Sequence, residues 1–217
     1  MRLRQIALVA HNLEPVAAQL NAVFGLNIAF RDPAVGVFGL VNAVMPVGGE
    51  FLEIVQPVTA DASAGRYLKR RGGDAGYMLI FEVPDAMAHR ARLEGQGVRI
   101  IAQHNTPQYT FTHFHPGDFG GVLTSIDTAG DGSSWRDRFS DWPPAGGHWR
   151  EALAPSDIGG IVALRSRPAI RKLQRAAGQT FCRLSWRAPR CGWTTRSSAL
   201  SHRSIRMEPA LWVSMLP

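Results

Sequence analysis

Residues 112–127 read THFHPGDFGGVLTSID. A short run that alternates polar and apolar residues ends at a Pro-Gly-Asp turn, and two glycines then precede a second run typical of a strand. His113 and His115 stand two positions apart, so in an extended strand their side chains point the same way. Because a His-x-His pair on a strand can bind a metal ion, the segment indicates two strands and a candidate metal site.

The elements around this segment follow one order twice. The first series is predicted as a strand at 4–10, a helix at 13–25, and strands at 26–31, 35–44 and 50–57. The second is predicted as a strand at 76–83, a helix at 85–97, and strands at 98–103, 109–115 and 121–127. A shift of 72 residues superposes the two series and places Gly25 on Gly97, the expected end of each helix. The sequence therefore predicts an α+β fold of two tandem βαβββ modules, residues 3–57 and 75–128, within a domain of residues 1–130.

Tandem βαβββ modules resemble the vicinal oxygen chelate superfamily, also called glyoxalase-like, over about residues 3–127. The stretches that carry the resemblance are LRQIALVAHNLEP at 3–15, EFLEIVQP at 50–57 and HFHPGDFGGVLTSID at 113–127. In that family the strands curl into an open cup, with helices against one face of the sheet and a ligand cleft on the other. The resemblance implies a protein that binds or transforms a small molecule and, if it is an enzyme, a lyase, isomerase or dioxygenase.

Metal-binding members of that family use four side chains, from the first and last strand of each module. Carried onto this sequence, the four positions are Gln5, Glu53, Tyr77 and Ser125. Glu53 is a good ligand, but a tyrosine with its ordinary pKa of about 10 and a neutral serine are poor ones. The resemblance thus implies that the family metal site is largely lost; the cofactor is left unassigned, with a divalent metal disfavoured.

Glu53 lies between Leu52 and Ile54 in a strand that is apolar on both faces. An unpaired carboxylate there would be costly, and burial would raise its pKa, so Glu53 is a candidate general base. The alternative is a carboxylate at the rim of the cup, satisfied by water or by an arginine such as Arg31. Both interpretations stay open.

The two histidines have different predicted roles. The shift of 72 places His113 on Val41, in the middle of a strand, which makes it a candidate acid/base or substrate-binding residue. The alternative is a hydrogen-bonded strand histidine. His115 begins the Pro-Gly-Asp turn and is interpreted as structural. A metal held by both histidines and Glu53 would lie outside the family scheme and is the least favoured interpretation.

Alternation along the strands predicts an apolar lining for the cup. The residues predicted to line it and contact a ligand are Ala7, Val9, Phe51, Val55, Leu79, Phe81 and Leu123. Such a lining favours a largely apolar or aromatic small molecule. Residues 131–154, rich in Trp, Pro and Gly, are predicted to form an aromatic arm that packs over the cup or against a partner chain, so a homodimer is possible.

A basic run, YLKRRGGD at 67–74, connects the modules. It is predicted to be an exposed linker helix that ends at the two glycines. The alternative is that Arg70 and Arg71 meet an anionic substrate at the mouth of the cup.

The charge of the chain is concentrated in its last part. The net charge is +7 with a pI near 10.4, but residues 155–217 carry +9 and residues 1–154 carry −2. The stretch CRLSWRAPRCGWTTRSSALSHRSIR at 182–206 shows neither helical nor strand periodicity. The first hypothesis is an out-of-frame remnant of a second glyoxalase-like domain. A disordered basic tail is the second hypothesis, and nucleic-acid binding through the tail is the third.

Two functions remain in competition. The first is an enzyme that works through Glu53 with help from His113, and the second is a non-catalytic protein that sequesters a ligand in the same cup. No apolar run reaches the roughly 18 residues of a membrane helix, and no cleavage pattern follows the first residues. A cytoplasmic protein without membrane contact is therefore expected.

Overall fold

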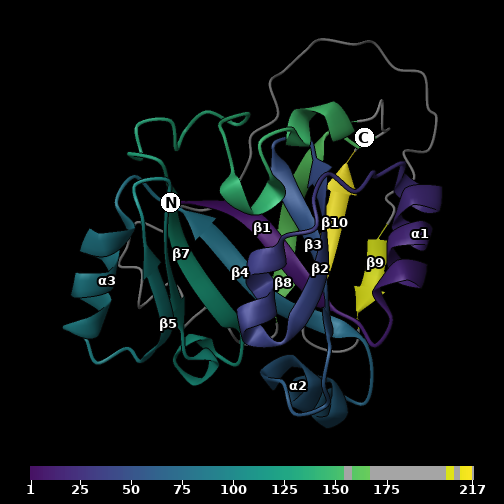
Figure 1. Cartoon of the computed structure of the whole chain (residues 1–217), viewed down its shortest axis with the longest axis horizontal. Coiled ribbons are helices and arrows are strands. Elements are labelled where there is room, and N and C mark those ends of the chain that lie inside the picture. The colour runs from purple at the N-terminus through teal and green to yellow at the C-terminus, as the bar shows by residue number, and fades with distance from the viewer. Residues whose placement is uncertain (154–157, 167–203, 208–210, 217) are drawn as a thin grey trace, which may run out of the picture.

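The computed structural model describes residues 1–153, 158–166, 204–207 and 211–216. Seven strands form one open, curved, mixed sheet in the order β2-β3-β1-β4-β7-β6-β5 (Figure 1). Their bounds are β1 Arg2–Val9, β2 Leu40–Val47, β3 Glu50–Pro57, β4 Ala75–Glu82, β5 Ile100–Asn105, β6 Tyr109–Phe114 and β7 Leu123–Ala129. The helices are α1 Leu13–Phe24, α2 Ser63–Arg71 and α3 Ala86–Glu94. The predicted α+β fold class is confirmed.

The two halves of the sheet meet where β1 pairs antiparallel with β4. On one side β1 pairs in parallel with β3, and on the other β4 pairs in parallel with β7. This arrangement repeats the same strand–helix–strand connection in both halves. It brings the first and last strands of each half to the centre of the sheet.

The first half has one strand fewer than predicted. Residues 26–31 form no strand beyond an isolated bridge from Phe30 to Val44. The strand predicted at 35–44 begins only at Leu40, because Pro33–Phe38 forms a 3-10 helix, η1. Asp32 caps η1 by accepting a hydrogen bond from the backbone N–H of Ala34, and Pro at the first position favours a helical start.

The halves also differ in register. Glu53 lies opposite Ala7, whereas Ser125 lies opposite Ile80, one position away from what a constant shift of 72 residues requires. The pairing of β1 with β4 is irregular at two places, between Leu3 and Gln5 and between Ala7 and Leu8. A β-bulge adds one residue to one strand and changes which side chains share a face. Alternation counted from the sequence therefore fails in β4.

One face of the sheet packs on α1 and α3. Leu13, Ala17, Leu20 and Phe24 recur at helical spacing along α1 and pack with Ile6 and Leu8. Leu79 and Phe81 of β4 belong to this same cluster. The prediction that these two residues line the cup is wrong: they lie on the helix-covered face, because the irregular pairing of β1 with β4 shifts the alternation.

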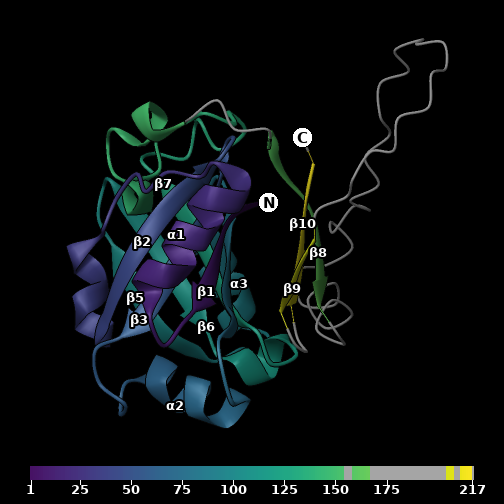
Figure 2. The same cartoon turned by 90° about the vertical axis from the view of Figure 1, so that its right-hand side faces the viewer.

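We call the opposite face the cup face. At one end it packs against the arm, residues 131–153, which contributes Trp142, Ala145 and Trp149 to a cluster with Phe51 and Ala7. The arm includes two short 3-10 helices, η3 Pro143–Ala145 and η4 Trp149–Ala152. At the other end, Ala64 and Leu68 of α2 pack with Val9 and Val55. Figures 1 and 2 show the arm and α2 at opposite ends of the sheet.

Beyond the arm, β8 Gly160–Ser166, β9 Ser204–Met207 and β10 Leu211–Leu216 form a separate sheet in the order β8-β10-β9. Cys182, Cys191 and most of the stretch without periodicity lie outside the described residues. The hypothesis of an out-of-frame tail therefore stays a prediction. Among the residues that the structure describes, no helix has the length and apolar character to cross a bilayer.

Candidate functional site

Glu53 lies near the middle of the cup face, with 6% of its surface exposed. The side-chain amide of Asn42 on β2 donates to its Oε1 at 2.7 Å, and that of Gln5 on β1 donates to its Oε2 at 2.9 Å. Arg31, which the sequence suggested as a partner, instead pairs with Glu14 at 2.9 Å. The carboxylate is therefore held by two neutral donors from the neighbouring strands.

The orientation of both amides is fixed by groups that can only donate. The indole N–H of Trp142 donates to Oε1 of Gln5 at 2.7 Å, and the backbone N–H of Asp32 donates to Oδ1 of Asn42 at 2.7 Å. Each amide must turn its oxygen toward its fixed donor. Each therefore presents its NH₂ group to Glu53, a pattern that fits an ionised carboxylate.

Burial of Glu53 favours its protonated form and so opposes the effect of these two hydrogen bonds. It raises the pKa of Glu53 above its ordinary value; the hydrogen bonds from Asn42 and Gln5 oppose this effect, and the nearby charge of Asp32 adds to it. The net pKa shift is upward, which makes Glu53 a stronger base than an ordinary carboxylate.

The second half of the sheet contributes another buried carboxylate, Asp127 on β7, with 1% of its surface exposed. The hydroxyl of Tyr109 donates to its Oδ2, and the hydroxyl of Ser125 donates to its Oδ1. Burial is the main reason that the pKa of Asp127 rises to about 7. At neutral pH both its protonated and ionised forms are populated.

The hydroxyl partners of Asp127 suit both forms. Ser125 Oγ also lies 3.3 Å from the backbone oxygen of Thr112. When Asp127 carries a proton, it can donate to Ser125, whose own hydrogen then points to Thr112. When Asp127 is ionised, the serine hydrogen turns back to it, so a hydroxyl adapts where an amide cannot.

A chain of contacts connects the two carboxylates through the arm. Trp142, which hydrogen-bonds Gln5, packs edge-to-face on Tyr109 with ring centroids 5.6 Å apart, and Tyr109 bonds Asp127. The charges of Asp127 and Glu53 both raise the pKa of Tyr109, after burial as the main cause. The phenol is therefore neutral, and it lies within electrostatic reach of both acids.

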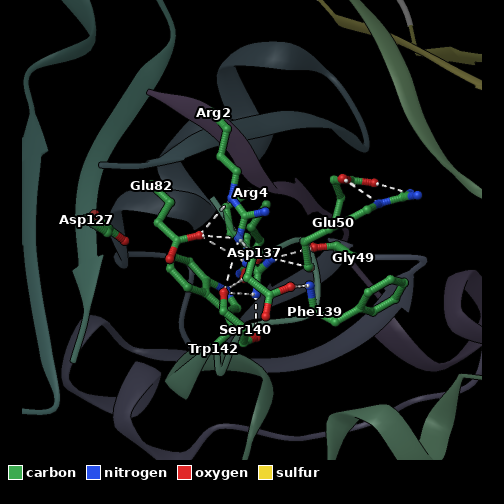
Figure 3. A network of polar contacts seen from close by, with 12 residues as sticks. Arg2, Arg4, Gly49, Glu50, Glu82, Asp127, Asp137, Phe139, Ser140 and Trp142 are labelled. Atoms are coloured by element: carbon green, nitrogen blue, oxygen red, sulfur yellow. Dashed lines mark hydrogen bonds and ion pairs between the residues drawn. The ribbon is translucent and has the colours of Figure 1, made fainter. Parts of the chain in front are cut away.

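The arm is fastened to the sheet by a buried cation, as Figure 3 shows. The guanidinium of Arg4 donates to the backbone oxygens of Gly49, Arg138 and Ser140 at 2.6, 2.8 and 2.7 Å. It also lies 5.0 Å from the ring centre of Phe51 and 5.3 Å from that of Trp142. Glu82 lies 3.4 Å from Arg4 and 2.7 Å from Arg2, so this end of the cup face is a closed polar and aromatic contact.

His113 and His115 have different surroundings in the structure. His113 is half-buried. Its ring stacks on that of Phe111, with the ring centroids 4.4 Å apart, and it contacts the ring of Phe38 in η1, with the centroids 5.6 Å apart. Burial lowers its pKa to about 4, so its imidazole is neutral at pH 7. Nδ1 of His115 accepts a hydrogen bond from the backbone N–H of Gly117, which confirms the predicted turn.

Tyr77 lies between Glu53 and α2. Its ring contacts that of Tyr67 on α2 at 5.6 Å, and Tyr67 donates its hydroxyl to the backbone oxygen of Gly76 at 2.8 Å. Burial raises the pKa of Tyr77, the charge of Glu53 raises it further and that of Arg66 lowers it. Tyr77 therefore stays protonated at neutral pH.

The four family positions do not fit a divalent metal ion. The carboxylate oxygens of Glu53 both face amide N–H groups, Gln5 turns its NH₂ toward Glu53, Tyr77 is a neutral phenol and Ser125 bonds Asp127. Cation coordination needs oxygen or nitrogen lone pairs directed at one point. Among the described residues, no three His, Cys, Asp or Glu side chains lie close enough together to hold a metal.

The other predicted lining residues are on the cup face. Phe51 and Leu123 lie in or against the arm-end cluster, and Val9 and Val55 in the α2-end cluster. In β4, Met78 and Ile80 take the places predicted for Leu79 and Phe81.

Some residues of the site were not predicted from the sequence. Asp127 stands two positions after Ser125, so strand alternation alone could have placed it on the same face. No local pattern marks Asn42 or Tyr109, although Asn42 stands only 11 positions before Glu53. Trp142 belongs to the arm that was predicted to pack over the cup; its hydrogen bond to Gln5 was not predicted.

Solved structures with this sheet topology include methylmalonyl-CoA epimerases, which have the vicinal oxygen chelate fold. No protein-family model matches the chain. Methylmalonyl-CoA epimerase of Streptomyces coelicolor, in complex with 2-nitronate-propionyl-CoA, superposes with a TM-score of 0.55 at 22% identity, over 59% of this chain and 97% of that one. The epimerase of Mycobacterium tuberculosis superposes with a TM-score of 0.53 at 22% identity, over 59% and 87%. The chain therefore has the fold of these epimerases.

In sequence, an ethylmalonyl-CoA/methylmalonyl-CoA epimerase of Cereibacter sphaeroides is 25% identical over 135 residues, which are 58% of this chain and 96% of the relative. The matched share of this chain is about the share that the two modules make up. The similarity supports the resemblance to the superfamily that the repeated modules indicated.

Proposed function

We propose that this chain is an isomerase-type enzyme that moves a proton at the carbon next to the carbonyl of an acyl thioester, with Glu53 as the base. The observation that carries the proposal is the buried carboxylate of Glu53, whose hydrogen-bond partners fit the ionised form while burial raises its pKa. The similarity to epimerases of CoA esters supports the substrate class and the reaction type.

The chemistry needs one group that removes a proton and one that returns it. The carboxylate of Glu53 takes the proton from the carbon, and the electron pair moves into the thioester as an enolate. Asp127, with a pKa of about 7, carries the proton that is returned to the carbon.

The other residues of the cup face are proposed to bind and orient the substrate. Leu123 and Tyr77, which are only partly buried, provide apolar surface for the acyl group, whereas Val9, Phe51 and Val55 are buried beneath α2 and the arm and support that surface. Neutral His113 serves as a hydrogen-bond partner rather than as a general acid, because its pKa of about 4 leaves it at pH 7 as a neutral imidazole, whose one N–H is a very weak acid. No step in this proposal passes through a metal ion.

The test is incorporation of deuterium from D₂O into methylmalonyl-CoA, followed by mass spectrometry. The full chain is expected to incorporate one deuterium at the acidic carbon. Glu53→Gln is expected to lose on the order of 10²- to 10⁴-fold in rate, the usual contribution of a general base. Glu94→Gln, an exposed acid on α3, is the matched control.

Glu53→Asp keeps the carboxylate and gives a second test if the glutamine variant does not fold. Thermal melts of each variant show which of them are folded. The aspartate variant is expected to retain measurable exchange. Exchange at the full rate in Glu53→Gln would refute the role of Glu53.

The second candidate is a non-catalytic binding protein. It is favoured by the burial of both acids, since Glu53 is 6% and Asp127 1% exposed and the four carboxyl oxygens accept hydrogen bonds. The same experiment separates the two functions, because a binding protein would bind the CoA ester without exchanging its proton.

A further inference from the structure

We propose that one face of α2 binds the phosphate groups of a CoA-type thioester whose acyl end lies at Glu53. We call this face the α2 cation face; it comprises Arg66, Lys69 and Arg70, which are all exposed. The inference rests on the proposed function and adds the part of the site that holds the nucleotide end of the substrate.

The spacing of the three cations places them together. Residues three and four positions apart on a helix are neighbours on its surface, and Lys69 and Arg70 follow Arg66 at those intervals. On the opposite side, Ala64 and Leu68 are buried and fix the helix against the sheet. Three positive charges are thus presented on a helix with a set orientation.

A pair of tyrosines joins this face to the carboxylate. Arg70 lies 5.4 Å from the ring centre of Tyr67, whose ring contacts that of Tyr77 at 5.6 Å. Tyr77 in turn responds to the charges of both Glu53 and Arg66. An extended ligand with its reacting carbon at Glu53 therefore meets α2 along Tyr77 and Tyr67.

The opposite end of the cup face is closed to such a ligand. There Trp142 and Trp149 pack on Phe51, and Arg4 joins the arm to the sheet. At the other end of the sheet (Figures 1 and 2), α2 packs on Val9 and Val55, but Tyr67 and Tyr77 beside it are only partly buried, so the long tail of a thioester is directed along these two tyrosines.

Charge gives the class of ligand. Like charges at this spacing repel one another on a bare helix, although cations in the last turn also favour the helix dipole. Phosphates would neutralise the cluster through charge-assisted hydrogen bonds, which arginine makes in pairs. The nucleotide end of a CoA ester carries phosphate groups. Its pantetheine part carries none.

The experiment compares two probes on the full chain by titration calorimetry, coenzyme A and pantetheine, at low and at physiological salt. Arg70→Gln is set against Arg136→Gln, since Arg136 is also exposed and also lies over an aromatic ring, at 4.9 Å from that of Trp135, but belongs to the arm. Arg66→Gln and Lys69→Gln follow separately.

Arg70→Gln is expected to weaken coenzyme A binding on the order of threefold to tenfold at low salt, with a smaller ratio at higher salt. Pantetheine binding and the Arg136→Gln variant are expected to match the unmodified chain. Equal losses in Arg70→Gln and Arg136→Gln, an equal loss for pantetheine, or no binding of coenzyme A by the unmodified chain would each overturn the inference. Deuterium exchange into methylmalonyl-pantetheine would still test Glu53 on its own.

Discussion

The two halves of the sheet each place one carboxylate on the cup face, but they surround it differently. In the first half, Glu53 accepts hydrogen bonds from two amides, those of Gln5 and Asn42. In the second half, Asp127 accepts hydrogen bonds from two hydroxyls, those of Tyr109 and Ser125. Both acids are buried and both have a raised pKa.

The difference lies in which form of the acid each set of hydrogen-bond partners favours. An amide that is locked by a donor on its far side can only donate to the acid, and so favours the ionised form. A hydroxyl can donate or accept, and so tolerates both forms. The proposed roles of Glu53 as base and Asp127 as proton carrier therefore rest on their hydrogen-bond partners more than on the depth of burial.

The largest expected effect is on the pH dependence of stability, and it belongs to Asp127. Its pKa in the folded chain is about 7 against a reference of 3.8, so the folded state binds the proton more tightly. The stabilisation is complete below the reference value and is lost as the pH rises through about 7. From about pH 5 to about pH 8 the free energy of unfolding should fall by on the order of 3 kcal/mol through this residue.

Urea denaturation of the full chain and of Asp127→Asn at several pH values measures this contribution. The variant should have a flatter profile, because asparagine does not titrate. Equal slopes in the two proteins would show that Asp127 has an ordinary pKa.

The next effect compares two amide substitutions at one pH. Glu53→Gln brings an NH₂ group against an amide that already donates, and a buried donor without an acceptor costs about 1–3 kcal/mol. Asp127→Asn should cost less than about 1 kcal/mol, since a hydroxyl can turn to accept from the new NH₂. Measured at about pH 7, equal losses for the two variants would contradict the difference between amide and hydroxyl partners.

The smallest expected change in stability tests whether the hydrogen bond from Trp142 fixes the orientation of the Gln5 amide. In Trp142→Phe the indole N–H is absent, so the Gln5 amide is free to turn its oxygen toward residue 53. The cost of Glu53→Gln should therefore shrink by about 1 kcal/mol in that background, measured as the coupling energy of a double-mutant cycle. Additive losses would mean that Trp142 does not set the orientation of Gln5.

The repeated order of elements could be predicted from the sequence because each helix and strand carries a local pattern. Leu79 and Phe81 were assigned to the wrong face since the irregular pairing of β1 with β4 interrupts the alternation. The strand expected at 26–31 is reduced to a single bridge, and the strand expected at 35–44 begins only at Leu40, because Pro33–Phe38 forms a 3-10 helix.

The candidate site was predictable only in part. Glu53 stands out as a charge between apolar residues, whereas its partners Asn42 and Gln5 are set by pairing between strands. The role of Trp142 depends on where the arm returns to the sheet, 137 residues after Gln5. Contacts of this range leave no periodic signal in the sequence.

The most direct test of the account is a pH titration of the side-chain carboxyl groups by ¹³C NMR in the full chain, with Glu53→Gln and Asp127→Asn used to assign the two signals. The expected result is one aspartate that titrates near pH 7 and one glutamate that titrates above its ordinary range, each missing in its own variant. If instead the Glu53 and Asp127 signals both titrate at ordinary carboxyl values near 4, neither acid is a proton carrier near neutral pH and the account is wrong.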